Sequence, residues 1–270
     1  MIRIVQFSGG KDSTALVLWA RERFGDDFVP LFCDTGWEHA LTYAYVAHIN
    51  QTVLGGRLVT VRSVKYADML DLVVKKGRVP SVRARFCTQE LKVFPTRDYL
   101  ATLADEHIVY QGIRADESAP RRDAGPRLWA DEYDCWIERP LFDWSADDVF
   151  ALHAKHGVDP NPLYKLGAGR VGCFPCIMVN HGELKRLSDT LPEVLERAAT
   201  LERAATRTFF PPNYIPARFC SLTDATTDRQ IPIPSVDDVR KYLREADEQQ
   251  IRLFDRSAPS GCMSVYNLCE

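Results

Sequence analysis

The chain has 270 residues, of which 46% are hydrophobic and 26% charged, and its formal net charge is −3. This composition is typical of a folded domain with a packed core, and it lacks the overall basic field of many nucleic-acid-binding proteins. No segment reaches the roughly 18 apolar residues of a membrane helix, and the amino terminus has no secretion-signal pattern. We therefore expect a cytoplasmic protein without membrane contact, whose eight cysteines serve metal or redox chemistry rather than disulfides.

Short apolar runs alternate with helical patterns through the first half of the chain. Strands are expected at Ile2–Phe7, Phe28–Cys33, Arg57–Val61 and His107–Gln111, and helices at Ser13–Phe24, Ala40–Leu54, Ala67–Lys76 and Phe94–Glu106. This alternation predicts an α/β fold of Rossmann-like type, a mostly parallel sheet with helices on both faces. Ligands of such sheets bind in the loops at the carboxyl ends of the strands.

The pattern changes near residue 160. Ser145 is expected to cap a helix that ends near His156, and Pro, Gly and Cys interrupt residues 160–176. Further on, the sequence predicts helices at Glu183–Thr206 and Ser235–Gln250, with extended segments at Pro211–Pro212 and Ile231–Pro234. We therefore predict an α/β domain over residues 1–160 and a helical and irregular, cysteine-bearing carboxyl-terminal extension over residues 161–270.

The segment Ser8-Gly9-Gly10-Lys11-Asp12-Ser13-Thr14 lies between the first expected strand and the first expected helix. Two glycines permit positive φ and close approach of a ligand, and the helix start supplies N–H groups and a positive dipole end. Lys11 adds a positive charge, while Ser8, Ser13 and Thr14 add hydroxyl groups. The spacing differs from that of the Walker A loop. The segment nevertheless predicts a phosphate-binding loop rather than an ordinary turn.

Two more expected strands end in polar loops at the same edge of the sheet. Asp34-Thr35-Gly36 and Glu38 follow the second strand, where the ribose or base of a nucleotide would lie, although a plain polar turn has the same pattern. Gly112-Ile113-Arg114 follows the fourth strand, and Arg114 suits a phosphate or sulfate. Glu117 suits an arginine or a hydroxyl group. An internal ion pair in this loop is the alternative, and the spacing leaves both open.

The pair Cys173-Phe174-Pro175-Cys176 lies in a loop rich in Gly and Pro. Its spacing lets both sulfurs bind one metal ion or one cluster, and a redox pair is the alternative. Further ligands would come from Cys87, Cys262 and Cys269. Because no His stands at a zinc-finger spacing, an iron–sulfur cluster and a Cys₄ zinc site both remain open. Cys33 and Cys135 are expected in the core, and Cys220 is undecided.

Six ordered motifs within residues 1–180 resemble the phosphoadenylyl-sulfate (PAPS) reductase family. They are Ser8–Ser13, Asp34–Gly36, Phe86-Cys87-Thr88 with Leu91-Lys92, Gly112–Ser118, Pro140–Ser145 and Arg170–Cys176. The resemblance implies the Rossmann-like fold of the HUP type and the PP-loop of the adenine-nucleotide α-hydrolase superfamily. It also implies an adenine nucleotide held by Ser8–Thr14, Asp34, Thr35, Gly36, Gly112 and Arg114.

Members of this family differ in their nucleotide. Sulfonucleotide reductases attack adenylyl sulfate or its 3′-phosphate with a carboxyl-terminal cysteine, whereas ATP-using relatives, such as the ATP pyrophosphatases of DNA phosphorothioation, keep the full Ser-Gly-Gly-Lys-Asp-Ser loop. The intact loop here favours ATP and release of pyrophosphate, with adenylylation of an acceptor for sulfur transfer. The resemblance further implies Mg²⁺ near Asp12 and a [4Fe–4S] cluster on Cys87, Cys173, Cys176 and a tail cysteine, Cys262 or Cys269.

In this interpretation Lys11, Asp12 and Cys262 carry the catalysis, and the substrate contacts are Arg83, Arg85, Lys92 and Glu117. The implied partners are a sulfur donor such as a cysteine desulfurase, or a thioredoxin, with nucleic acid as one candidate acceptor. Two alternatives remain: a sulfonucleotide reductase that makes sulfite with Cys262 or Cys269 as nucleophile, and a non-catalytic iron–sulfur subunit or sensor that binds a nucleotide. The oligomeric state is left open.

Overall fold

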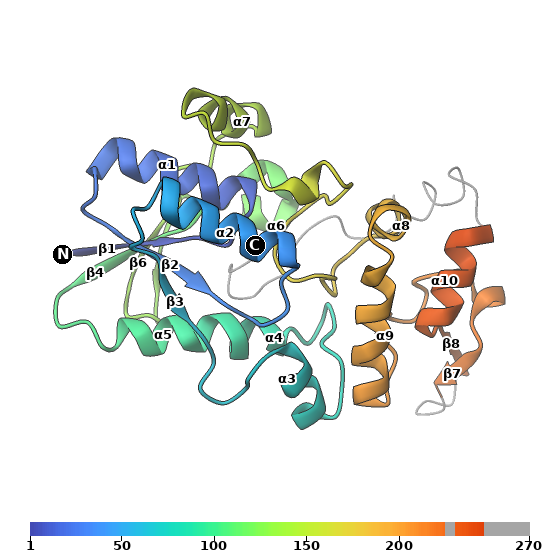
Figure 1. Cartoon of the computed structure of the whole chain (residues 1–270). Coiled ribbons are helices and arrows are strands. Elements are labelled where there is room, and N and C mark those ends of the chain that lie inside the picture. The colour runs from blue at the N-terminus through green and yellow to red at the C-terminus, as the bar shows by residue number, and fades with distance from the viewer. Residues whose placement is uncertain (225–229, 246–270) are drawn as a thin grey trace.

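The computed structural model describes residues 1–224 and 230–245 (Figure 1). Its main sheet has the strand order β3-β2-β1-β4-β6-β5. The strands are β1 (Ile2–Gln6), β2 (Val29–Cys33), β3 (Val59–Val61), β4 (His107–Tyr110), β5 (Arg127–Ala130) and β6 (Cys135–Glu138). All neighbouring pairs are parallel except β5 and β6, which form an antiparallel hairpin. The mostly parallel, Rossmann-like sheet predicted from the sequence is therefore confirmed.

The hairpin of β5 and β6 is absent from the sequence-based prediction. Both strands have four residues, and each carries a tryptophan on its exposed face, so that the sequence shows no alternation of apolar and polar residues. Cys135 and Ile137 are buried, whereas Trp129 and Trp136 are exposed and contact each other edge to face. The strand pair is therefore specified by pairing with β4 rather than by local sequence.

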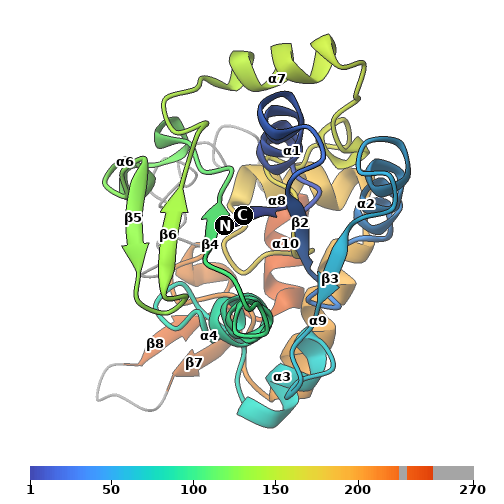
Figure 2. The ribbon, with the colours of Figure 1, turned by 90° about the vertical axis from the view of Figure 1, so that its left-hand side faces the viewer.

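Helices cover both faces of the sheet, as predicted. On one face lie α1 (Lys11–Phe24), α2 (Ala40–Thr52) and α7 (Ala146–Lys155), which bury a cluster that includes Phe7, Leu16 and Ile49. On the other face, α5 (Phe94–Leu100) packs on Ile4 and Val109. Figure 2 shows α1 and α7 on one side of the strands, and α3 (Met69–Lys76) and α4 (Phe86–Thr88) toward the other.

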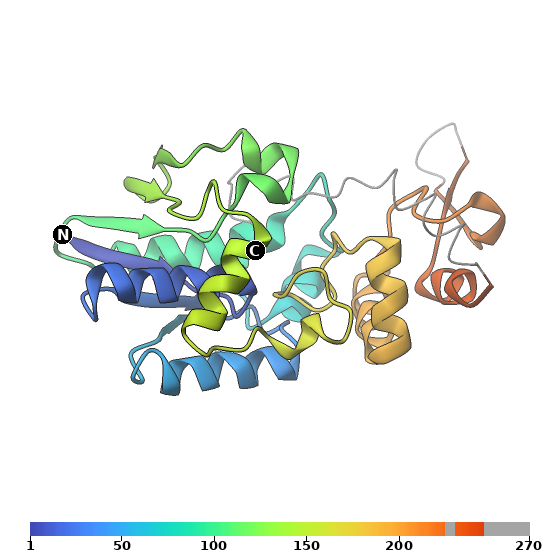
Figure 3. The same cartoon turned by 90° about the horizontal axis from the view of Figure 1, so that it is seen from above.

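The helices α8 (His181–Thr190), α9 (Glu193–Ala205) and α10 (Val236–Glu245) lie beyond the carboxyl ends of the strands (Figures 1 and 3), next to a small hairpin of β7 (Leu222–Asp224) and β8 (Ile231–Ile233). An extensive buried apolar cluster combines Trp37 and Leu72 of the first predicted domain with Phe174 and Leu201 of the second. This packing brings the Cys173–Cys176 loop to the carboxyl edge of the sheet. The domain boundary at residue 160 stays a prediction.

Several predicted element bounds need correction. The single helix expected over Glu183–Thr206 is wrong: α8 and α9 are separated at Leu191–Pro192, since Pro192 lacks the N–H that a continuous helix needs. The helix expected to reach Glu106 ends at Leu100, because the carbonyl of Glu106 already accepts a sheet-like bond from the Ile2 N–H at 2.7 Å.

Other local signals agree with the structure. Ser145 caps α7 by accepting from the Asp148 N–H, and the predicted extended segment Ile231–Pro234 contains β8. A π-helical turn (Gln89–Val93) joins α4 to α5, so that helical backbone begins before the helix start predicted at Phe94. The helix predicted at Ser235–Gln250 corresponds to α10 as far as Glu245, and its residues 246–250 lie outside the described residues. In the described part of the chain, every helix is too short or too polar to cross a bilayer.

Candidate functional site

The predicted phosphate loop forms a tight turn between β1 and α1. Gly9 has a φ of +79°, and a Cβ atom on it would lie 3.0 Å from Val46 Cγ2. Gly10 is extended and caps α1, which starts at Lys11. The Asn161 side chain donates to the Gly9 carbonyl at 3.1 Å. The turn thus needs glycine both for its left-handed backbone and for the space beside α2.

The hydroxyl groups of the loop stabilise its shape. Ser13 Oγ and Thr14 Oγ1 donate to the Gly10 carbonyl at 3.0 and 2.9 Å. Ser13 Oγ also accepts from the Ser8 N–H at 3.2 Å and lies 3.1 Å from Ser8 Oγ. Ser13 and Thr14 are buried, whereas Ser8 is partly exposed. Nucleotide contact by these hydroxyls stays a prediction, and the structure assigns them to holding the turn.

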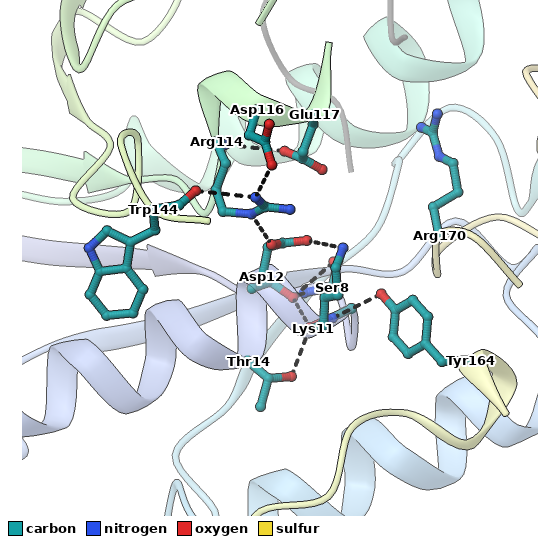
Figure 4. Close-up of polar contacts among 12 residues, drawn as sticks. Ser8, Lys11, Asp12, Thr14, Arg114, Asp116, Glu117, Trp144, Tyr164 and Arg170 are labelled. Carbon is teal, nitrogen blue, oxygen red and sulfur yellow. Dashed lines mark hydrogen bonds and ion pairs between the residues drawn. The ribbon is translucent and has the colours of Figure 1, made fainter. Parts of the chain in front are cut away.

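Asp12 lies between two cations at the first turn of α1. Its carboxylate accepts from Lys11 Nζ and from Arg114 Nε, each at 2.6 Å, and its side chain is 1% exposed (Figure 4). Burial by itself raises the pKa of Asp12, but the charges and hydrogen bonds of Lys11 and Arg114 outweigh it and lower the pKa. The carboxylate is therefore charged at neutral pH. Each carboxylate oxygen thus accepts one hydrogen bond, and magnesium contact by Asp12 stays a prediction.

The loop after β4 packs directly on this turn. A Cβ atom on Gly112 would lie 2.8 Å from the carbonyl oxygen of Asp12, so only glycine fits there without a shift. Arg114 donates to the Trp144 carbonyl at 3.2 Å, and its backbone N–H donates to Glu117. Glu117 also pairs with Arg121. Both Arg114 and Glu117 thus make the internal ion pairs that the sequence left as an alternative, and their contact with a ligand stays a prediction.

The sequence did not reveal three polar neighbours of the loop. The Lys11 N–H donates to the Tyr164 hydroxyl at 3.0 Å, and Lys11 Nζ lies 5.6 Å from the centre of the Tyr164 ring. His153 Nε2 lies 2.8 Å from the Lys11 carbonyl, and Asn161 holds Gly9. Figure 4 shows Tyr164 approaching Lys11 from the side opposite Arg114. More than 140 residues separate these partners from the loop, so that no spacing signal could indicate them.

The loop after β2 is a closed polar network. The Tyr43 hydroxyl lies 2.8 Å from Asp34 Oδ1 and 2.9 Å from Glu38 Oε2, so that the two carboxylates share its single proton. Arg62 forms an ion pair with Asp34. Thr35 Oγ1 donates to Glu38 Oε1 at 2.6 Å and lies 3.7 Å from Cys173 Sγ. Burial, together with the two carboxylates, raises the pKa of Tyr43 well above its usual range. This network connects the sheet edge to the cysteine loop.

A pocket with an empty volume of about 580 Å³ opens beside the phosphate loop. Ser8, Ser13 and Gly112 form one end, while Cys33 and Tyr133 lie farther along its wall. Its walls mix apolar and polar groups, as small-ligand sites commonly do. Cys135 is buried as expected, but Cys33 is partly exposed and lines this pocket, because it ends β2 at the carboxyl edge. A ligand in this pocket would therefore contact the predicted phosphate loop.

A second pocket, with an empty volume of about 790 Å³, contains the predicted cysteine ligands Cys87, Cys173 and Cys176, together with Arg85 and Lys92. Lys92 lines both pockets. Burial raises the pKa of Cys87 to about 11 and that of Cys173 to about 12. The thiols are thus neutral at pH 7 in this arrangement.

The Cys173–Cys176 loop is fastened to the loop after β2. The Phe174 N–H donates to the Trp37 carbonyl at 2.8 Å, and Trp37 Nε1 donates to the Pro175 carbonyl at 3.2 Å. Arg197 donates to the Phe174 carbonyl at 2.7 Å and lies over the Trp37 ring at 4.2 Å. The position of the two sulfurs is therefore fixed by hydrogen bonds to and from the main chain of residues 174 and 175.

The donor set of this pocket fits a cluster in kind, since thiolates are the usual ligands of iron–sulfur groups. Within residues 1–224 and 230–245, however, no three or more His, Cys, Asp or Glu side chains are arranged to hold a metal ion. The predicted ligands Cys262 and Cys269, and with them the predicted catalytic Cys262, lie outside the described residues. A metal or cluster at this site stays a prediction.

The remaining predicted substrate residues are not all in one place. Arg85 lines the cysteine pocket and donates from Nη2 to Thr88 Oγ1 at 3.1 Å. Lys92 lies between the two pockets, whereas Arg83 is exposed on the segment before α4. Arg170, which lines the cysteine pocket, had been noted only as part of a motif.

A mostly parallel sheet, with a glycine-rich phosphate loop after its first strand, defines a Rossmann-like α/β protein of the phosphate-loop class. Residues 3–179 match the phosphoadenosine phosphosulfate reductase domain, and the chain belongs to this family.

Relatives of known sequence and structure agree with this assignment. The chain is 33% identical to a 37.8 kDa protein of Escherichia phage 186, over 100% of this chain and 97% of that protein. It is 32% identical to an adenosine 5′-phosphosulfate reductase of Allochromatium vinosum, over 41% of this chain and 42% of that enzyme. The crystal structure of phosphoadenylyl-sulfate reductase from Candida auris matches with a TM-score of 0.52 at 17% identity, over 65% of this chain and 83% of that chain. The last comparison supports the fold.

Proposed function

We propose that this protein binds ATP at Ser8–Thr14 and cleaves it between the α- and β-phosphates, so that an acceptor is adenylylated for sulfur transfer. The observation that carries the proposal is the intact phosphate loop, with left-handed Gly9 at the start of α1 and Lys11 held beside the buried Asp12–Arg114 pair. Fixed positive charge at a helix start favours bound phosphates.

The chemistry follows from this geometry. An acceptor oxygen attacks the α-phosphorus, the bond from that phosphorus to the α–β bridging oxygen breaks, and pyrophosphate leaves with the bonding electrons. Lys11 and the α1 N–H groups stabilise the charge that develops on the phosphates. Mg²⁺, when bound, neutralises part of the pyrophosphate charge. The terminal sulfur of a persulfide on a donor such as a cysteine desulfurase then attacks the adenylylated atom, and AMP leaves with the bonding electrons. A thiol reductant such as reduced thioredoxin cleaves the resulting disulfide, which leaves the sulfur on the acceptor and oxidises the reductant.

The cysteine pocket has a role in this proposal as the sulfur-handling site. Cys87, Cys173 and Cys176 would hold a [4Fe–4S] cluster, with Cys262 or Cys269 as the fourth ligand. Such a cluster, when bound, supplies a site for electron or sulfur transfer. Lys92 lines both pockets and would hold positive charge between the nucleotide and the sulfur.

A second candidate is a sulfonucleotide reductase, which is favoured by the 32% identity to an adenosine 5′-phosphosulfate reductase. A thiolate of Cys262 or Cys269 would attack the sulfur of adenylyl sulfate and release AMP, forming a thiosulfonate. A reduced thioredoxin would then release sulfite and become oxidised. A protein that binds nucleotide without turning it over would instead match the subunit or sensor alternative.

A substrate panel separates these candidates. Oxygen-free protein is incubated with ATP, adenylyl sulfate or phosphoadenylyl sulfate, with and without reduced thioredoxin, and pyrophosphate, AMP and sulfite are measured. We expect pyrophosphate and AMP from ATP when acceptor and sulfur donor are present, and no sulfite. Sulfite from either sulfonucleotide, lost in the Cys262→Ser or Cys269→Ser variant, would establish the reductase instead.

The cluster is tested by an absorbance spectrum and by iron and sulfide analysis of protein purified without oxygen. We expect a broad band near about 400 nm that Cys173→Ser and Cys176→Ser lose. Cys220→Ser is the matched control, because Cys220 is also partly exposed but is absent from the lining of the cysteine pocket. Colourless, iron-free wild-type protein would contradict the cluster and leave the ATP chemistry to be judged by the substrate panel.

A further inference from the structure

Exposed cations surround the carboxyl end of α3. Residues 62–85 contain seven Lys and Arg residues but two acidic ones, in a chain whose net charge is −3. Five exposed cations of this segment form what we call the α3 basic patch: Lys65, Lys75, Lys76, Arg78 and Arg83. Arg62 is also exposed but pairs with Asp34. Positive charge is thus concentrated at one place on an otherwise acidic chain.

Stabilisation of the fold explains only part of this patch. Lys75 and Lys76 lie in the last turn of α3, where they complement the helix dipole, and they pair with Asp71 at 2.7 Å and Glu90 at 2.8 Å. The other three, Lys65, Arg78 and Arg83, form no salt bridge with any residue that the structure describes. Their charge is available to an anionic partner.

Two buried rings support the patch from below. Lys65 Nζ and Lys75 Nζ lie 5.2 and 5.5 Å from the centre of the Tyr66 ring. Arg78 Cζ lies 5.1 Å from the centre of the Phe86 ring. Tyr66 is 4% and Phe86 9% exposed, so the rings orient the cations but cannot stack on a ligand. This surface is suited to phosphate groups rather than to bases.

The segment that carries the patch leads along the chain into the wall of the cysteine pocket. Phe86, which underlies Arg78, is followed in the chain by Cys87, and Arg85, Cys87 and Arg170 all line the pocket. A long anion on the patch could therefore extend one of its groups into the pocket.

From these observations we infer that the α3 basic patch binds the phosphodiester backbone of a nucleic acid, which serves as the acceptor of this site. A small anion is held by converging groups, whereas these cations are spread over the end of an eight-residue helix and both flanking segments. Such an arrangement matches repeated phosphates, which occur about every 3.4 Å along one strand. The role as acceptor rests on the proposed function, but the binding itself does not.

The test measures fluorescence anisotropy of labelled oligonucleotides of about 20 nucleotides with the full chain, between about 50 and 200 mM salt. Single-stranded DNA, duplex DNA and RNA are separate arms that identify the strand type. The combined variant Lys65→Gln, Arg78→Gln, Arg83→Gln should bind at least about tenfold more weakly at low salt, and its log–log salt slope should fall by about 2 to 3.

The matched control removes the same charge elsewhere. Arg21, Arg23 and Lys155 are exposed on α1 and α7, and their combined change to Gln should leave affinity within about twofold. Thermal unfolding confirms that both variants are folded. Equal salt slopes for the two variants, or no binding by wild type at low salt in any arm, overturn the inference.

Binding is measured without ATP, so that its failure is separable from that of the proposed chemistry. Patch-dependent binding by a protein that releases no pyrophosphate supports the surface and contradicts the proposed function. Pyrophosphate release with an oligonucleotide acceptor, lost in the patch variant, supports both.

Discussion

Replacing Lys11 by methionine should lower the rate of ATP turnover by about 10²- to 10³-fold, the usual effect of removing one charged or hydrogen-bonding group from a stabilised phosphate or oxyanion. Lys11 Nζ lies 2.6 Å from Asp12 at the start of α1, and its side chain is 14% exposed. The ammonium group thus lies at the mouth of the phosphate loop. Asp12 keeps its bond to Arg114 in this variant, so the fold should persist.

Initial rates of pyrophosphate release, together with nucleotide affinity by calorimetry, test this expectation. Lys11→Arg keeps the charge and should recover part of the rate, which a purely structural role would not require. Lys155→Met, at an exposed position on α7, is the control for the same chemical change. Turnover by Lys11→Met at the wild-type rate would show that the loop does not carry the reaction.

Replacing Asp12 by asparagine should destabilise the protein by about 3–5 kcal/mol, the usual cost of breaking a buried ion pair from one side. Arg114 is 3% exposed, and its Nε lies 2.6 Å from Asp12 Oδ1, so the variant leaves the buried guanidinium with only the exposed Asp116 carboxylate, 3.6 Å from its Nη1. Urea unfolding at neutral pH measures the loss. The double variant Asp12→Asn, Arg114→Gln should recover much of it, because neither charge is then buried alone.

The same pair predicts a pH dependence with a definite sign. Burial works against it, but Lys11 and Arg114 lower the folded-state pKa of Asp12 below its unfolded value. Its stabilising contribution is therefore complete above the unfolded value, near pH 4, and is lost as the pH falls through the folded value. The stability difference between wild type and Asp12→Asn should shrink below about pH 4. A difference that stays constant down to pH 2 would mean that the Asp12 carboxylate does not make this contribution.

The sheet and the phosphate loop were predictable because their signals are local. Gly9 and Gly10 between an apolar run and an amphipathic segment specify a strand, a turn and a helix within about twenty residues. The start of α7 was predictable in the same way, because the Ser145 cap involves only the backbone N–H of Asp148, three residues further along the chain. Where the signal is weak, as in the four-residue strands β5 and β6, pairing with β4 decides the structure and the sequence pattern fails.

The sequence by itself determined the α/β class, the glycine turn at Ser8–Thr14 and the close spacing of Cys173 and Cys176, because each depends on neighbouring residues. Only the tertiary structure decided that Arg114, 102 residues after Asp12 in the chain, pairs with its carboxylate. It also decided that Tyr164 and Asn161, more than 140 residues after the loop, form hydrogen bonds to the loop backbone. It also brought Cys87 into one pocket with Cys173 and Cys176. Burial and charge compensation depend on the packing of distant segments, and no pattern of spacing records which segments meet.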